Sequence, residues 1–124
     1  MIDLDSLMFT RTDEWVKYVD KNIALVGITE NAIKLLGKIK YISLPKVGDF
    51  LKVGDVLART ESSISDGKVY SPFDGIVVEV NDSLAKHPEQ IIENPFGVWI
   101  AKIEFNGNRD ILLSYEEYCE EINS

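Results

Sequence analysis

The sequence predicts a mainly β protein, a flattened barrel or two-sheet sandwich with short helices added. Short runs of β-branched and aromatic residues recur along the chain, and glycine- and aspartate-containing turns separate them. Only a few stretches have the periodicity of a helix. With 124 residues, of which 45% are hydrophobic, the chain suits one domain with a modest core, spanning residues 1–124.

The first two strands are predicted to form a hairpin. Residues 14–19 alternate weakly, and the polar residues 20–22 supply a turn before the apolar run 23–28. The motif Val-Gly-Asp occurs at 47–49 and 53–55, where it indicates turns with glycine at positive φ or an Asx-type turn. Further strands are expected at residues 38–44, 56–61, 76–80 and 98–105.

Short helices are expected near residues 29–36, 83–87 and 114–122. Thr29 is placed to cap the first of these, because its hydroxyl can accept an N–H of the first turn, and Gly37 ends it. Ser114 and Glu117 have the spacing of a capping box at the start of the last helix.

The composition excludes several classes of partner. A net charge of −8 argues against nucleic acid, whose phosphates require clustered lysine and arginine. No apolar run approaches the length of a membrane-spanning helix, so no membrane association is expected. One cysteine cannot form an internal disulfide, and the acidic start lacks the basic flank of a signal peptide. The expected location is therefore cytoplasmic.

The sequence also argues against an enzyme. A zinc site needs about four ligands, whereas the chain has one cysteine and one histidine. No nucleophile elbow, phosphate loop or dinucleotide fingerprint is present. His87 lies before Pro88 in a polar segment, and nothing places it near the serines of 62–65. We therefore expect no catalytic residues and no metal site.

Several stretches in order resemble the H protein of the glycine cleavage system and, more distantly, the lipoyl and biotinyl carrier domains. They are DEWVKYVDKNIALVGIT, LGKIKYISLPKVGDFLKVGDVLARTES, YSPFDGIVVEVNDSL and HPEQIIENPFGVWIAKI, and the resemblance extends over roughly residues 12–118. The resemblance implies a lipoyl-type flattened β-barrel of two sheets. The biotin-type tip, Ala/Val-Met-Lys-Met, is absent.

The resemblance implies a carrier rather than an enzyme. In this family a lipoyl group, amide-linked to a lysine at a hairpin tip, takes an aminomethyl group from glycine decarboxylase. It presents that group to the aminomethyltransferase and is reoxidised by dihydrolipoamide dehydrogenase. These three enzymes are the partners that the resemblance implies.

The chain departs from the family pattern at the hairpin tip. Family members have approximately Glu-Ser-x-Lys there, followed by Tyr-x-Pro. This chain has Glu61-Ser62 and Tyr70-x-Pro72 with the usual number of residues between them, which puts Ile64 at the lipoyl-lysine position. An isoleucine cannot be acylated. The expected protein is therefore a non-lipoylated H-like protein with no cofactor.

Lys68 offers an alternative lipoyl site. Asp66-Gly67 is a strong two-residue turn signal and would put Lys68 beside the turn. That turn would shift the cross-strand register unless a bulge at Gly67 absorbed the difference. Otherwise Lys68 is an ordinary strand lysine.

Two functional hypotheses follow, a lipoyl carrier modified at Lys68 and a non-catalytic interaction module for glycine-cleavage or lipoate-handling enzymes. Ile64 is either a single exposed apolar residue without a role or a contact that enters a partner's groove. The family's His-Glu-Trp is Asp13-Glu14-Trp15 here, so Glu14 occupies the position that the resemblance places near the loaded arm.

Overall fold

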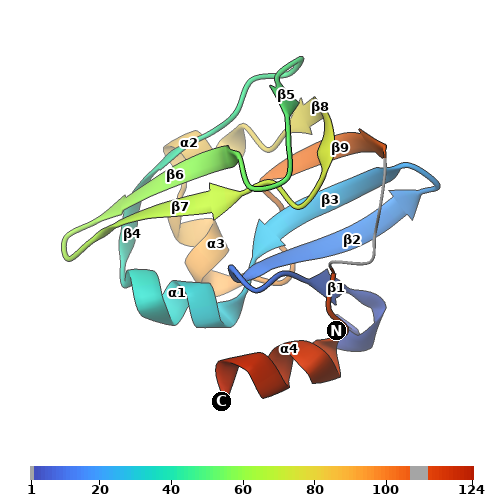
Figure 1. Cartoon of the computed structure of the whole chain (residues 1–124). Helices are drawn as coiled ribbons and strands as arrows, with labels where there is room; N and C mark the ends of the chain where they lie inside the picture. The colour runs from blue at the N-terminus through green and yellow to red at the C-terminus, as the bar shows by residue number, and fades with distance from the viewer. Residues whose placement is uncertain (1, 107–111) are drawn as a thin grey trace.

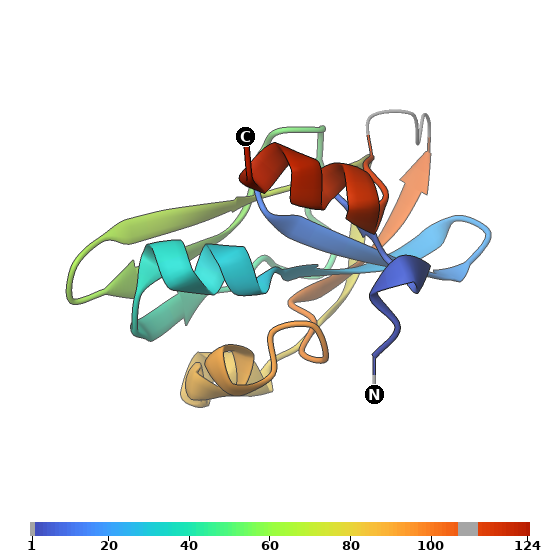
Figure 2. The same cartoon turned by 90° about the horizontal axis from the view of Figure 1, so that it is seen from below.

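The structure is a computed structural model that describes residues 2–106 and 112–124. Within these residues, a pair of antiparallel sheets is surrounded by short helices (Figures 1 and 2). The larger sheet has the order β1 (Met8–Phe9), β2 (Glu14–Asp20), β3 (Ile23–Ile28), β9 (Ala101–Asn106), β8 (Asp74–Val80) and β5 (Phe50–Leu51). The smaller sheet has the order β4 (Ile39–Ser43), β6 (Val56–Ser62) and β7 (Asp66–Tyr70). This confirms the predicted mainly β, two-sheet class, although the two sheets are not closed into a barrel.

The helices are η1 (Leu4–Ser6), α1 (Glu30–Leu36), α2 (Ser83–Lys86), α3 (Glu89–Glu93) and α4 (Tyr115–Ile122). In Figure 2, α4 lies on one side of β2 and β3, and α2 and α3 lie on the other. The Thr29 hydroxyl accepts the Ala32 N–H at 3.2 Å, and Gly37, at φ +79°, ends α1 as predicted. The segments β1, β5, η1 and α3 were not predicted separately, because each is too short for a periodic pattern.

Two hydrophobic clusters hold the elements together. The larger lies between the sheets and includes Val26, Leu57 and Ile103. The smaller gathers the N- and C-terminal segments and consists of Leu7, Phe9, Trp15, Leu113 and Tyr118. In the smaller cluster the rings of Phe9 and Tyr118 stack with centroids 4.8 Å apart. The last helix is therefore packed onto the start of the chain.

The two Val-Gly-Asp motifs form matching turns, as predicted. Gly48 and Gly54 have φ of +96° and +87°, which an L side chain rarely adopts. In each turn an aspartate carboxylate accepts the N–H of the lysine three residues before it, at 3.0 Å from Lys46 and 2.9 Å from Lys52. The turns direct the chain into β5 and then into β6.

We predict that Gly27→Ala destabilises the fold. Gly27 of β3 pairs with Trp15 of β2, and a Cβ at this position would lie 2.4 Å from the indole ring. Overpacking of this kind costs about 1–3 kcal/mol in the free energy of unfolding, measured by urea denaturation. The exposed Val19→Thr on β2 serves as the control and should change that free energy by no more than about 0.5 kcal/mol. Equal stability of Gly27→Ala and the unchanged protein would contradict the packing described here.

Candidate functional site

The β6–β7 hairpin is centred on Ser63 and Ile64. The Ser62 N–H donates to the Ser65 carbonyl at 2.9 Å, so these residues form the last hydrogen-bonded pair before a two-residue apex. Along the strands, Glu61 pairs with Asp66 and Thr60 with Gly67. The apex of the hairpin therefore consists of Ser63 and Ile64.

The alternative turn at Asp66-Gly67 is not formed. Gly67 lies within β7, and a Cβ added to it would lie 2.2 Å from Leu36 Cδ2 of α1 and 2.6 Å from Thr60 Oγ1. This position is thus a close approach of helix and strand, which only glycine accommodates. The bulge suggested at Gly67 is also absent, since the register of this ladder shifts between Val56 and Ala58 instead.

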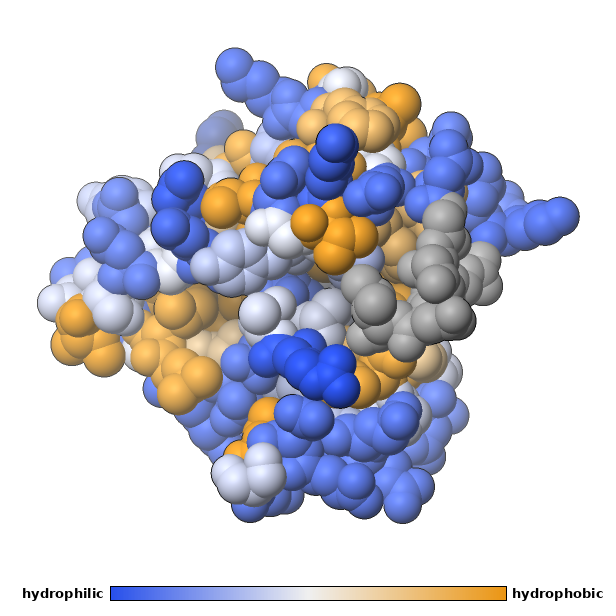
Figure 3. Space-filling model, viewed as in Figure 1, coloured by the Kyte–Doolittle hydropathy of each residue, from blue (hydrophilic) through white to orange (hydrophobic). Residues whose placement is uncertain are grey.

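Ile64 projects from the apex into solvent. Ile64 is 75% exposed, and its Cδ1 and Cγ1 atoms approach Gly37, where a Cβ would lie 2.7 and 3.1 Å from them. Hydrophobic surface is visible at the tip of this hairpin and over neighbouring α1, where Leu35 is 66% exposed (Figure 3). The apex thus presents a hydrocarbon side chain and no amine.

Lys68 lies in the ladder and away from the apex. It pairs with Arg59 of β6, and the next residue, Val69, points into the core, so the Lys68 side chain is on the outward face. Glu61 and Asp66 share this face. Among the described residues, no carboxylate lies within ion-pair distance of Lys68 Nζ. Lys68 is accessible, but at a side of the hairpin rather than its tip.

Glu14 is a buried carboxyl group, with 1% of its surface exposed. The hydroxyls of Thr10 and Thr12 donate to Oε1 at 2.6 and 2.5 Å, and the Tyr70 N–H donates to Oε2 at 3.2 Å. Burial raises the pKa of Glu14 from 4.5 to about 7, although these hydrogen bonds act in the opposite direction. The group can therefore gain or lose a proton near neutral pH.

Glu14 lines an open cavity of about 470 Å³ with a mostly apolar wall. The other lining residues include Thr10, Thr12, Val53, Tyr70 and Pro72. Neither Ile64 nor Lys68 is among them. The structure thus brings Glu14 to the end of β7 and keeps both hairpin candidates outside the cavity.

The loop that precedes Glu14 is fastened to α4. Asp13 has φ of +71°, and its carboxylate accepts the Tyr118 hydroxyl at 2.6 Å and the Asn31 amide at 3.1 Å. The Tyr118 oxygen also lies 2.7 Å from the Thr29 hydroxyl. Burial and the bond to Asp13 raise the pKa of Tyr118 above its ordinary value.

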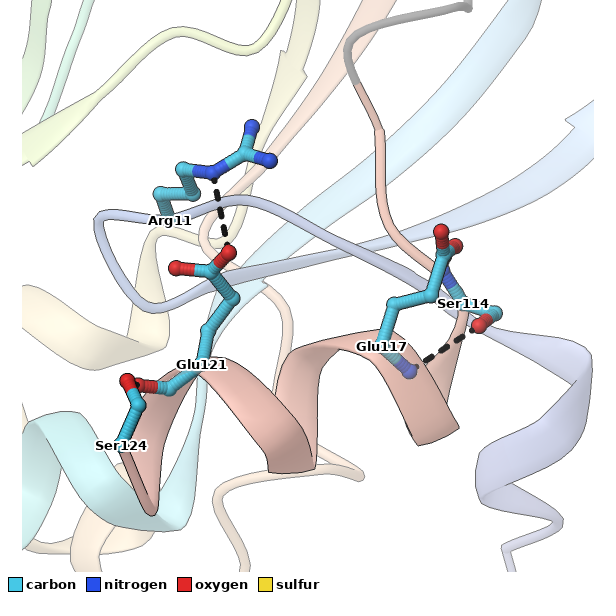
Figure 4. A network of polar contacts seen from close by, with 5 residues as sticks. All are labelled: Arg11, Ser114, Glu117, Glu121 and Ser124. Carbon is cyan, nitrogen blue, oxygen red and sulfur yellow. Dashed lines mark hydrogen bonds and ion pairs between the residues drawn. The ribbon is translucent and has the colours of Figure 1, made fainter.

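Two further contacts support this arrangement. The Arg11 guanidinium lies 3.5 Å from the Glu121 carboxylate of α4 (Figure 4). The predicted capping box is present at the start of α4, where Ser114 and Glu117 exchange side-chain to backbone hydrogen bonds (Figure 4). The ion pair thus links the C-terminal half of α4 to the loop, and the capping box satisfies backbone N–H groups at the start of the helix itself.

Sequence reasoning found Glu14 but missed the residues that hold it. The signal available was the closeness of Thr10, Thr12 and Glu14 along the chain, at the turn that joins β1 to β2. Tyr118 was assigned only to the apolar stripe of its helix. Its hydroxyl partner lies more than a hundred residues away along the chain, and no local pattern reports such a contact.

No group of three or more potential metal ligands occurs within the described residues. Across the same ranges of the chain, none of the helices has the length and hydrophobicity needed to cross a bilayer. His87 lies 3.2 Å from the Glu89 carboxylate on the surface, and no serine nucleophile accompanies it.

With this geometry in view, comparison with known proteins identifies the family. Residues 7–124 match the model of the glycine cleavage H-protein family. A probable glycine cleavage system H protein of Pyrococcus abyssi is 42% identical over 123 residues, covering 97% of this chain and 92% of the relative. One of Thermoplasma volcanium is 46% identical over 114 residues, covering 92% of each.

The fold agrees with a solved structure as well. The crystal structure of a glycine cleavage system H protein from Mycobacterium marinum superimposes with a TM-score of 0.86 at 26% identity, covering 97% of this chain and 98% of that one. The chain belongs to the glycine cleavage H-protein family. Members of this family are lipoyl carrier proteins and not enzymes, which agrees with the expectation for this chain.

We predict that Glu14 makes stability fall as pH rises. Because the folded-state pKa is about 7 and the unfolded value about 4.5, the native state binds the extra proton between these values. The free energy of unfolding, relative to Glu14→Gln, should decrease by about 3 kcal/mol between pH 4 and pH 8. Urea denaturation at several pH values measures this, with the exposed Glu116→Gln as the control. A difference independent of pH would contradict the buried position of Glu14.

We predict that Tyr118→Phe loosens α4. The variant keeps the ring against Phe9 but leaves the half-buried Asp13 carboxylate and the buried Thr29 hydroxyl without the Tyr118 hydroxyl as partner. The free energy of unfolding should drop by about 1–3 kcal/mol, as urea denaturation measures. Tyr41→Phe, at a 65% exposed position, is the matched control and should have no effect. Equal stability of both variants would show that the contact at Tyr118 contributes nothing.

Proposed function

We propose that this protein is an H-like protein that carries no lipoyl group and acts as a non-catalytic binding module. The observation that supports this proposal is the Ser63–Ile64 apex of the β6–β7 hairpin. The chain has the flanking residues of the family motif, Glu61-Ser62 and Tyr70-x-Pro72, and Ile64 falls at the lipoyl-lysine position between them.

The chemistry of lipoyl attachment explains why the residue at the apex determines whether the protein can be modified there. The lipoyl carboxyl group is transferred to a primary amine, whose lone pair attacks the activated acyl carbon. The side chain of Ile64 has no lone pair and cannot form that amide. A substitution at this one position therefore removes the attachment while leaving the fold around it intact.

Lys68 is the second candidate, because it is an exposed primary amine on the same hairpin. The position of Lys68 argues against its modification, because it lies in the β6–β7 ladder, opposite Arg59 and four residues after the apex residue Ile64. A ligase that accepts a lysine at a protruding turn would meet Ile64 there and would find Lys68 at the side of the strand. We therefore favour the unmodified form.

The surface remains available for protein partners. We propose that the protein binds enzymes of glycine cleavage or of lipoate handling through the scaffold it shares with its family, without passing an aminomethyl group between them. Glu14, which the resemblance places near the loaded arm, then has a structural role in its pocket. A cytoplasmic location belongs to this proposal, supported by the lone Cys119.

Co-expression with a lipoate–protein ligase and added lipoate, followed by intact-mass measurement, tests the proposal. The unchanged protein should gain no mass. The Ile64→Lys variant restores an amine at the apex and should gain the mass of one lipoyl group, located at residue 64 by peptide mapping. Lys68→Arg, in the natural background and combined with Ile64→Lys, is the matched control and should alter neither result.

Two results would contradict the proposal. A lipoyl adduct on the unchanged protein that disappears in Lys68→Arg would show that Lys68 is the attachment site and the protein a carrier. An Ile64→Lys variant that stays unmodified would show that residue 64 is not the acceptor position.

A further inference from the structure

The β7 strand has an open edge. It is the terminal strand of the three-stranded sheet, so one side of its backbone faces no other strand among the described residues. Because Ser62–Ser65 and Thr60–Gly67 are hydrogen-bonded pairs, the N–H and C=O groups of Asp66, Lys68 and Tyr70 point to the open side.

Glu14 closes one end of this edge. Its Oε2 accepts the Tyr70 N–H at 3.2 Å, which also confirms the direction in which these backbone groups point. The open edge therefore consists of Asp66 and Lys68, beside the exposed apex. An edge of this kind is a site for pairing with another strand.

The charges on this edge complement themselves. Asp66 and Lys68 are separated by one residue, Gly67, and carry opposite charges. In an antiparallel pair of two β7 strands with the two-fold axis at Gly67, Asp66 of each copy lies opposite Lys68 of the other. A two-fold axis at Asp66 or at Lys68 would instead place like charges opposite one another. Charge thus selects a single register.

The same register brings together two apolar features. It places Ile64 of one copy opposite Tyr70 of the other, because Ile64 and Tyr70 are each three residues from Gly67, on either side of it. Ile64 is 75% exposed, and Tyr70, Val53 and Pro72 belong to the wall of the open, mostly apolar cavity of about 470 Å³. By symmetry this contact occurs twice, and each occurrence removes apolar surface from water.

The other long open edge does not favour such pairing. β4 is the opposite terminal strand of the same sheet, and the lysines of this segment, Lys38 and Lys40, give it charge of one sign. Lysines on an edge strand discourage association with a second copy. Self-complementarity is therefore a property of β7 and not of open edges in this fold generally.

We infer that the protein forms a symmetric dimer through antiparallel pairing of its β7 strands, with Ile64 of each copy seated in the cavity beside Tyr70 of the other. The interface is small, with backbone hydrogen bonds expected only between the Asp66 and Lys68 positions of the two copies, and the dimer is a weak one. This inference concerns the unmodified protein and does not depend on which enzymes it binds.

Sedimentation equilibrium of the full chain tests the dimer. The unchanged protein should show a monomer–dimer equilibrium below about 1 mM. Asp66→Lys and Lys68→Asp each place like charges opposite one another twice, so each should raise the dissociation constant at least about tenfold. Ile64→Ser should also weaken the dimer.

The most decisive experiment mixes the two single charge variants, Asp66→Lys and Lys68→Asp. One variant has lysine at both positions and the other has aspartate at both, so an equimolar mixture should form a heterodimer about as tight as the natural dimer. The double variant, Asp66→Lys with Lys68→Asp, should dimerise as the unchanged protein does. Restored association also shows that each single variant is folded.

Three results would overturn the inference. The unchanged protein could be monomeric up to about 1 mM, the single charge variants could dimerise as tightly as the unchanged protein, or the mixture could stay monomeric. The last two would show that β7 does not form the interface in the stated register. None of these results bears on lipoylation, which the mass measurement decides separately.

Discussion

The pairing register of β6 and β7 is the constraint on which the rest of this structure depends. With Thr60 opposite Gly67 and the Ser62–Ser65 pair closing the turn, the apex consists of Ser63 and Ile64. A shift of register by one residue would turn each side chain to the other face of the strand. Val69 would then leave the core, where it is 2% exposed, and an outward charge would replace it. The burial of Val69 therefore opposes a one-residue slip, and the close packing of Gly67 against Leu36 and Thr60 opposes a turn at Asp66-Gly67.

The second feature of the site is the Glu14 carboxyl group, which the surrounding residues bury. Glu14 begins β2, directly after a loop that Asp13 and Tyr118 hold to α4, and it closes the Tyr70 end of β7 by accepting the Tyr70 N–H. The hairpin, the N-terminal loop and the C-terminal helix thus form one continuous assembly, although their sequences are far apart. This assembly does not depend on the residue at the hairpin tip, because Ile64 is largely exposed and contributes little to the packing.

Much of this arrangement was predictable from local signals. The caps Thr29 and Ser114, the Val-Gly-Asp turns and the alternating strands act over a few residues, and all formed as expected. Asp66-Gly67 was misleading as a possible turn, because the glycine there is required by the approach of Leu36 rather than by backbone conformation. The cradle of Glu14 and the Tyr118–Asp13 contact depend on tertiary packing between distant segments. Sequence patterns do not report such contacts, so only some of the site was predicted.

The central claim, that the hairpin turns at Ser63–Ile64, can be tested most directly by NMR in solution. In an antiparallel ladder, the Cα protons of a non-hydrogen-bonded pair lie close enough for a strong nuclear Overhauser effect. The structure predicts such signals between Arg59 and Lys68 and between Glu61 and Asp66. Signals of this kind linking Ile64 with Val69 or Ser62 with Ser71 would place the turn at Asp66-Gly67 and contradict the account.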